Sequence, residues 1–545
     1  MKNVYGNVDG DNILNVYPRP QMKRKSFINL NGYWDYAITS EEGIPDVYDG
    51  RMLVPFSPES KLSGVGKIIK NNQVLWYHRE LKLEKEITEG HLLLHFGAID
   101  QEAWVYVNGF SVAHHLGGYL GFTVDITEYI SADNDIYVKV KDLREKGECS
   151  IGGQLSDKSC FSGIWQTVWL EEVPEHYIRS VQITPIFDEC AVELMVMSDN
   201  NYLCTAKVMD KEITFEANRR TIISLDSVIE WTPQYPYLYT VIIEMNEDRI
   251  ETYFGMRKIS VEQDNNGIQR IYLNNRPFFF NGICDEGYYG DSGYTAMSDR
   301  AMIYDIYSAK KMGFNMIRKH LKIEPMRWYY HCDRMGMLAW QDILTGICSW
   351  ERKSLSDTGE QRTDEKYIKK KYYEYELEGM VKALYNCVSI VAWIAPEQKY
   401  GKFDSATALR SLMAKDKTRL LNFSSYNKSN VSGDVKCVLS SNILGVGGIR
   451  INDKYKRAVV VMDAGKYECR INKEYAQEIN KKMTAKYREL YSKKIWNAYK
   501  QGLSGVIFNY LSDNKEHFCG ILTEDRKISK FNRSVIRMIN KNYNG

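Results

Sequence analysis

Hydrophobic and polar residues alternate in short runs over the first part of the chain. Ala103 to Val107 is one such run, and the Asn108-Gly109 pair behind it is a strong hairpin-turn signal. Sustained from residue 1 to about 178, the pattern predicts a β-sandwich or jelly roll. Strand-like runs with fewer polar motifs continue from about 179 to 262, where we expect a second, smaller sandwich.

The periodicity changes at about residue 263. Helical stretches such as Asp299 to Met312 now alternate with short apolar runs such as Phe314 to Ile317. Strands that alternate with helices over the whole of 263–545 predict a (β/α)8 TIM barrel.

Polar side chains follow the apolar runs of this predicted barrel. The run Val388 to Trp393 is typical of a buried parallel strand, apolar on both faces. TIM barrels carry their chemistry at the carboxyl ends of such strands. Glu397, Gln398 and Tyr400 follow this run and are therefore candidate site residues.

Composition narrows the partners that we expect. A formal net charge of +2 gives no reason to expect nucleic acid or an anionic membrane as a partner. No apolar run is long enough to span a bilayer, and residues 1–12 lack the apolar segment of a signal peptide. Eleven cysteines without paired spacing are typical of reduced thiols, so we expect a cytoplasmic protein. Zinc-binding motifs are missing too, and we expect no metal and no cofactor.

Several local motifs resemble glycoside hydrolase family 2, the β-galactosidase and β-glucuronidase group. In the first domain these include Trp76-Tyr77-His78-Arg79 and the run from Ser162 to Leu170. In the second they are Trp231 to Tyr239 and the exit Phe254 to Arg257. The resemblance implies a jelly-roll sugar-binding-like domain over 1–178, an immunoglobulin-like β-sandwich over 179–262, and a TIM-barrel glycosidase-like domain over 263–545.

The resemblance also assigns roles in the barrel. In the family, a catalytic acid/base Glu stands five residues after a strand Trp, with an Asn before it. Counting from Trp393 gives Gln398, preceded by Glu397. The nucleophile strand resembles Ala458 to Tyr467, with Asp463 where the family has Glu. By the same resemblance Arg318 orients the nucleophile. The remaining candidates, His320, Asp342, Tyr400 and Tyr510, bind substrate.

The two altered positions predict impaired catalysis. A retaining glycosidase needs two carboxyl groups about 5–5.5 Å apart. Gln398 cannot transfer a proton, and losing general acid catalysis costs on the order of 10²- to 10⁴-fold. Asp463 is one methylene shorter than Glu. We therefore favour a pseudo-glycosidase that binds a β-glycoside or oligosaccharide. A second copy of the chain, in a homo-oligomer, is the other partner that we consider.

Two alternatives stay open from the sequence. Glu397 would serve as the acid, with Asp463 as nucleophile, in an active exo-β-glycosidase of galactosidase or glucuronidase type. Adjacent strand residues face opposite sides, so this requires the strand end to rewind, which Pro396 assists. The other alternative is a different chemistry in the same barrel, because fold does not fix function.

Overall fold

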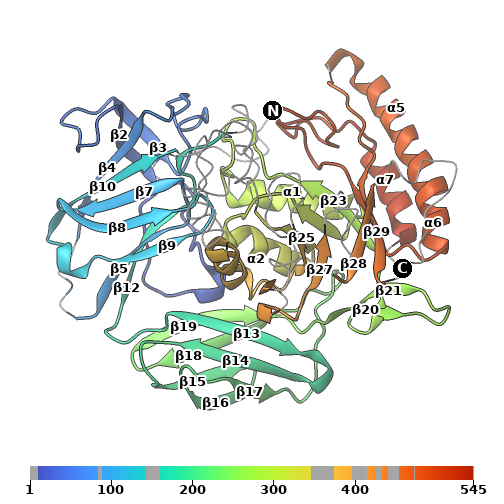
Figure 1. Ribbon diagram of the computed structural model, residues 1–545, viewed down its shortest axis with the longest axis horizontal. Coiled ribbons are helices and arrows are strands. Elements are labelled where there is room, and N and C mark those ends of the chain that lie inside the picture. The colour runs from blue at the N-terminus through green and yellow to red at the C-terminus, as the bar shows by residue number, and fades with distance from the viewer. Residues whose placement is uncertain are drawn as a thin grey trace, which may run out of the picture.

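The computed structural model describes residues 10, 12–83, 87, 89–142, 160–344, 374–395, 411–412, 414–423, 433–439, 453, 455–471 and 473–543. Figure 1 shows three parts: an amino-terminal β domain, a smaller β domain beneath it, and a barrel followed by the carboxyl-terminal helices. No helix among the described residues is long and apolar enough to cross a membrane.

The first domain is the predicted jelly roll. A four-stranded sheet, β1-β12-β5-β9, packs on a six-stranded sheet, β3-β2-β4-β10-β7-β8, and β11 pairs with β6. Inward-facing apolar side chains of both sheets form its core. The strands are β1 (Ile28–Asn29), β2 (Gly32–Thr39), β3 (Gly50–Val54), β4 (Val74–Lys82), β5 (His91–Phe96), β6 (Ile99–Asp100), β7 (Glu102–Val107), β8 (Phe110–Leu116), β9 (Phe122–Asp125), β10 (Asp133–Lys141), β11 (Gly163–Ile164) and β12 (Val168–Val173).

The second domain is a small sandwich with its own apolar core. A three-stranded sheet, β13-β14-β17, faces a four-stranded sheet, β16-β15-β18-β19. A short sheet, β20-β21-β22, leads from it into the barrel. The strands are β13 (Ser180–Ile186), β14 (Ala191–Met197), β15 (Leu203–Val208), β16 (Lys211–Glu216), β17 (Thr221–Ser224), β18 (Tyr239–Met245), β19 (Asp248–Phe254), β20 (Ile259–Gln263), β21 (Gln269–Leu273) and β22 (Arg276–Pro277).

The third part is a closed barrel of eight parallel strands, which confirms the predicted fold class. In the barrel, β29 pairs with β30, and β30 pairs with β23 to close the sheet. Trp393, Met462 and Ile317, which we expected on inner strands, lie on β26, β29 and β24. The strands are β23 (Phe280–Asp285), β24 (Met316–Lys319), β25 (Leu338–Asp342), β26 (Ile390–Ala395), β27 (Leu420–Phe423), β28 (Val435–Leu439), β29 (Ala458–Ala464) and β30 (Gly505–Phe508).

Strand β26 begins two residues later than the predicted run from Val388. The amide of Ser389 donates to Asp333 Oδ1 at 2.6 Å, and Arg257 takes the carbonyls of Val388 and Ile390. Side chains therefore take up the carbonyl of Val388 and the amide of Ser389. The carbonyl of Ser389 accepts from the amide of Ala339 of β25, and the paired register starts at Ile390.

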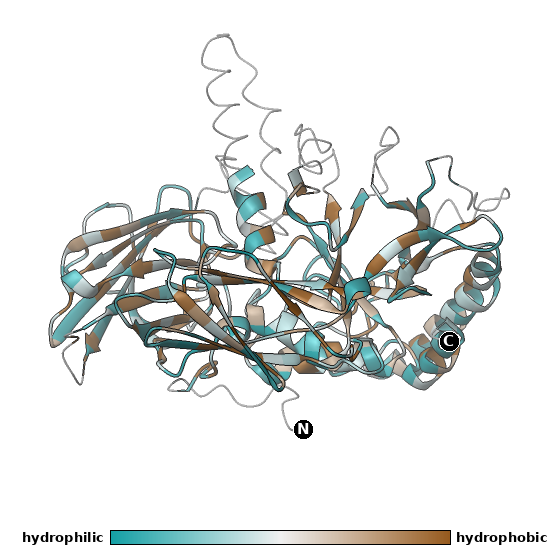
Figure 2. Ribbon diagram, turned by 90° about the horizontal axis from the view of Figure 1, so that it is seen from below, coloured by the Kyte–Doolittle hydropathy of each residue, from teal (hydrophilic) through white to brown (hydrophobic). Residues whose placement is uncertain are grey.

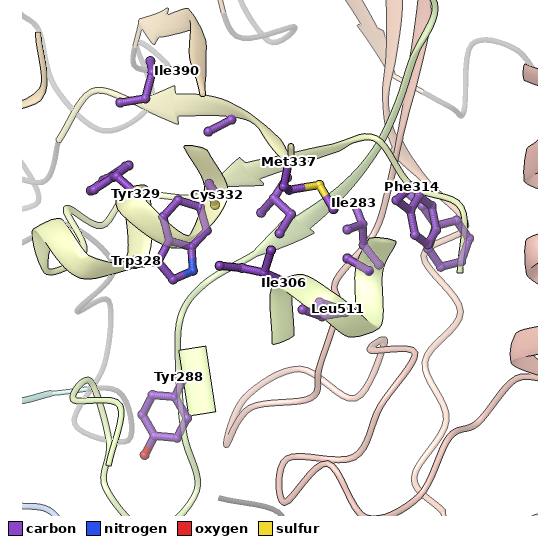
Figure 3. Packing of buried hydrophobic residues seen from close by; sticks show 14 of the residues in the cluster. Ile283, Tyr288, Ile306, Phe314, Trp328, Tyr329, Cys332, Met337, Ile390 and Leu511 are labelled. Atoms are coloured by element: carbon purple, nitrogen blue, oxygen red, sulfur yellow. The ribbon is translucent and has the colours of Figure 1, made fainter. Parts of the chain in front are cut away.

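The helices cover the outside of the barrel. Among them are α1 (Asp299–Lys311), α2 (Met326–Met335), α5 (Ala476–Glu489), α6 (Trp496–Lys500) and α7 (Arg533–Asn540), with a π-helix η8 (Leu490–Ile495) between α5 and α6. The described residues 374–384 are helical too. Figure 3 shows Ile306 of α1 and Trp328 of α2 in the buried layer that joins these helices to the barrel strands. Ser298 is the N-cap of α1, because its hydroxyl accepts a hydrogen bond from the amide of Ala301.

A buried ion-pair network joins the first two domains. Glu171 of β12 accepts from Tyr17 at 2.6 Å and from Arg19 at 2.7 Å. Arg24 bridges the domains, because Nη1 donates to Glu171 at 3.0 Å and Nη2 donates to Asp248 of β19 at 2.8 Å. Glu171 is 0% exposed, so water does not compete with Arg19 and Arg24 for its carboxylate.

We expect Glu171→Gln to destabilise the protein by about 3 kcal/mol at neutral pH. Burial alone would raise the pKa of the Glu171 carboxyl, but Arg19, His95 and Arg24 lower it from 4.5 to about 2. The carboxylate stabilises the fold fully above pH 4.5, and this contribution is lost as the pH falls toward about 2. Urea unfolding of both proteins across this range measures the difference.

The matched control is Glu175→Gln. Its carboxylate is 70% exposed and lies 3.7 Å from His91, so less than about 1 kcal/mol is expected. An unfolding difference for Glu171→Gln that equals the control, or that grows on acidification, contradicts the assigned role.

Candidate functional site

The candidate site begins with Arg318 of β24, whose side chain faces the barrel interior. Its register neighbours are Cys284 of β23 and Trp340 of β25, so the three share one row of the inner face. Arg318 makes a two-armed contact with Asp342, from Nε at 2.9 Å and from Nη2 at 2.8 Å. Both side chains are almost fully buried. From the sequence we expected Arg318 to orient the nucleophile and Asp342 to bind substrate. In the structure the guanidinium of Arg318 donates its two hydrogen bonds to Asp342.

His320 completes this group. Its Nδ1 lies 2.6 Å from Asp342 Oδ2 and 3.3 Å from Arg318 Nη2. Burial alone would raise the pKa of the Asp342 carboxyl, but Arg318 and His320 lower it below its ordinary value. Asp342 also raises the pKa of Arg318, against the effect of burial. The group therefore remains an ion pair over the working pH range.

Asp463 lies near the end of β29, as the sequence placed it. Its Oδ1 is 3.8 Å from Arg318 Nη1, and the side chain is 30% exposed. The backbone has φ +53°, a left-handed conformation that Asp adopts more readily than most residues. The register with β30 shifts between Val461 and Ala464, so Asp463 lies at an irregularity of the ladder near the end of β29. Arg318 thus contacts both carboxylates, but only Asp342 closely.

Gly465, two residues after Asp463, stands where only a glycine fits. It has φ +74°, and a Cβ there would lie 2.1 Å from the ring of Phe508. Any side chain would displace this ring of β30.

A second polar group lies across the rim, around Tyr510. This tyrosine also has a left-handed backbone, and its ring stacks on His517 with centroids 5.6 Å apart. Burial and the nearby Glu286 carboxylate raise the pKa of Tyr510 well above its ordinary value. Glu286 follows β23 directly and accepts a hydrogen bond from Asn514. Sequence reasoning missed Glu286, although it follows an apolar run as the other candidates do.

The interior beneath the rim holds further polar groups that the sequence did not single out. Asn422 Nδ2 donates to Cys437 Sγ at 2.7 Å, and burial raises the pKa of this thiol to about 12. Burial also raises the pKa of the Cys284 thiol well above its ordinary value, so neither cysteine is a nucleophile at neutral pH. Among the described residues, none bonds to Asn422 Oδ1 or Trp340 Nε1, although both side chains are 0% exposed. These atoms can bind water or a ligand group at the barrel interior.

The structure brings together Arg318, His320, Asp342 and Asp463, and Tyr510 lies within their electrostatic reach. Glu397, Gln398 and Tyr400 lie outside the described residues. The described part of the site can hold a carboxylate beside a fixed cation, and it offers hydrogen-bonding groups of both signs to a polar ligand.

Three matches to one family divide the chain. Residues 64–174 match Glycosyl hydrolases family 2, sugar binding domain; residues 176–257 match Glycosyl hydrolases family 2; and residues 265–516 match Glycosyl hydrolases family 2, TIM barrel domain. Together they cover most of the chain.

Characterised sequences and solved structures agree with these matches. A putative β-glucuronidase of Formosa agariphila is 27% identical over 349 residues, covering 60% of this chain and 40% of the relative. A β-galactosidase of Thermoanaerobacter pseudethanolicus is 28% identical over 299 residues, covering 50% and 39%. The chain thus spans about 40% of the length of these two relatives. A β-glucuronidase of Ruminococcus gnavus has the same fold, with a TM-score of 0.76, 17% identity, and coverage of 98% of this chain and 99% of that one. A β-galacturonidase of Eisenbergiella tayi bound to galacturonate follows, with a TM-score of 0.73, 17% identity, and coverage of 96% and 99%.

Proposed function

Because this chain belongs to glycosyl hydrolase family 2, we propose that its barrel mouth binds β-linked carbohydrate and hydrolyses it very slowly or not at all. The observation that supports this proposal is the state of the catalytic positions. The substrate-side group of Arg318, His320 and Asp342 is intact, whereas the acid/base position is Gln398 and the nucleophile position is Asp463.

The acid/base change is one of two causes of the proposed impairment. Departure of a sugar or alcohol leaving group requires a proton, and an amide can donate a hydrogen bond but cannot release a proton. Loss of general acid catalysis costs on the order of 10²- to 10⁴-fold. Asp463 adds a positional cost, since a displacement of about 1 Å can lower the rate on the order of 10²-fold. The two costs need not multiply, because the groups serve one reaction.

The retained groups support binding. Arg318 and Asp342 form a buried ion pair at the rim. Loss of either residue alone would leave the other charge buried without its partner, which is costly, so the pair presents both charges in a fixed position. Asn422 Oδ1 and Trp340 Nε1, which have no hydrogen-bond partner among the described residues, add polar atoms that a ligand can contact in the interior.

The proposal predicts a steep dependence on the leaving group. Aryl β-glycosides whose phenols are acidic leave without protonation, so residual hydrolysis appears there first and falls as the phenol becomes less acidic. Initial rates over a series of aryl galactosides and glucuronides measure this dependence, with Asp463→Asn as the matched control that removes any remaining nucleophile. A flat series, with equal rates for poor and good leaving groups, means that a proton donor is at work and contradicts the proposal.

A second candidate function is an active exo-β-glycosidase. The contact between Asp463 and Arg318 favours it, because the carboxylate stands beside the cation that would keep it ionised. Glu397 then acts as the acid. Under this candidate Glu397→Gln abolishes hydrolysis, whereas under the favoured proposal it changes little.

A further inference from the structure

The outer face of the carboxyl-terminal helices carries a concentration of positive charge. Helices α5 to α6 and α7 to the final 3₁₀ turn η9 (Lys541–Tyr543) hold ten lysines and arginines against two glutamates, a net charge of +8. The whole chain has a net charge of +2, so the rest is negative. Figure 1 shows α5, α6 and α7 side by side at the outer edge of the barrel. The seven exposed members are Lys481, Lys482, Arg488, Lys493, Lys500, Arg537 and Lys541, which we call the basic face.

The helices are fixed relative to one another by their buried sides. Tyr487 of α5 donates to Asn540 of α7 at 2.7 Å, and the amide of Asn532 donates to Thr484 at 2.8 Å. Tyr543 donates to the carbonyl of Tyr491 at 2.7 Å. Since these inner sides pack together and on the barrel, the cations are left on the outer side, which Figure 2 shows as largely hydrophilic.

The basic face is not neutralised by the protein itself. Some surface lysines elsewhere pair with acids, such as Lys211 with Asp226 at 2.6 Å and Lys258 with Asp188 at 2.7 Å. Within the described ranges, none of the seven basic-face residues forms an ion pair. Like charges four residues apart on one helix, such as Lys482 and Lys486 of α5, cost a few tenths of a kcal/mol. The two glutamates of these helices, Glu478 and Glu489, offset only part of the positive charge.

We propose that the basic face binds an acidic polysaccharide. A uniform field of cations attracts a polymer of regularly spaced anions. The face exposes one aromatic ring, Tyr475, at the start of α5, and one large apolar side chain, Met538. It therefore has no series of rings on which unpaired bases stack, and no apolar strip that enters a lipid surface.

The length of the face also fits a polymer. The 25 residues from Ala476 to Lys500 form a continuous helical segment about 37 Å long. Five of its exposed cations spread along this length, and Arg537 and Lys541 of the neighbouring α7 and η9 widen it. The choice of carbohydrate rests on the proposed function, but the charge and its placement do not.

The test measures binding of heparin, a sulfated polysaccharide, to the full chain at salt concentrations of about 50 to 200 mM. The expected affinity falls linearly with salt on logarithmic axes, by about threefold per contact over this range. The triple variant Lys481→Glu, Arg488→Glu, Arg537→Glu is expected to bind at least about tenfold more weakly than the parent. A control with the same charge change, Lys67→Glu, Lys70→Glu, Lys207→Glu, places three exposed substitutions on the other two domains and is expected to bind heparin like the parent.

Equal heparin binding by the two triple variants, or none by the parent, overturns the proposal. Tighter binding of duplex DNA or of phosphatidylserine vesicles than of heparin also overturns it and identifies the other polyanion. Asp463→Asn, at the partly exposed end of β29, separates this surface from the barrel mouth, because heparin binding is expected to survive it. The surface proposal and the proposed function can therefore fail independently.

Discussion

The double variant Gln398→Glu, Asp463→Glu is expected to hydrolyse aryl β-glycosides of weakly acidic phenols at least about 10²-fold faster than the parent, because these leaving groups need a proton and about 10² is the low end of the contribution of general acid catalysis. The first change returns a proton donor, and the second extends the carboxylate at the rim of β29 by one methylene. Arg318 stands beside position 463 at 3.8 Å and would keep the nucleophile ionised. The left-handed backbone at 463 costs Glu about 1 kcal/mol more than Asp, which is small against the expected gain.

Each single change is expected to do little, since donor and nucleophile serve one reaction. The single variants are therefore the matched controls, and unfolding in urea verifies that all four proteins are folded. If the parent already turns over and Glu397→Gln abolishes this, while the double variant gains nothing, the site works through Glu397 and the account is wrong.

Arg318→Ala is expected to destabilise the protein by about 3–5 kcal/mol, because it leaves Asp342 charged and buried. Asp342 is 3% exposed and receives two hydrogen bonds from Arg318. Arg318→Lys keeps the charge but loses the fork, so an intermediate loss is expected. Urea unfolding measures both.

The paired substitution Arg318→Met, Asp342→Leu separates stability from function. Removing both charges together avoids the buried unpaired carboxylate, so most of the lost stability should return. Carbohydrate binding at the rim should not return, because the polar group is gone. Full stability in Arg318→Ala alone would show that Asp342 finds solvent or another partner, contrary to the geometry described.

The sequence predicted the scaffold well because its signals are local and repeated. The apolar runs Phe314 to Ile317 and Val388 to Trp393 located β24 and β26 to within two residues, and the family resemblance placed Asp463 near the end of β29. The barrel strand β24 extends further than its apolar run, since Arg318 and Lys319 continue the ladder. Lys319 is buried there between Asp285 and Glu324, a pairing of charges that polarity alone could not predict.

The sequence did not predict which side chains of the site pair with one another. Spacing places Arg318, Asp342 and Asp463 at one rim but does not say which carboxylate takes the fork, and the fork goes to Asp342. Glu286 was not predicted because the family resemblance assigns no role to that position. The unsatisfied atoms of Asn422 and Trp340 depend on side-chain packing across several strands, which no local pattern records.

The most direct test of the central claim is the hydrolysis of an unactivated β-linked disaccharide by the purified parent protein. The account predicts that the disaccharide is recovered intact, with product release at least about 10²-fold slower than from an aryl glycoside with a good leaving group. Rapid turnover of the disaccharide, at a rate close to that of the aryl glycoside, would mean that the site has a working proton donor and would contradict the account.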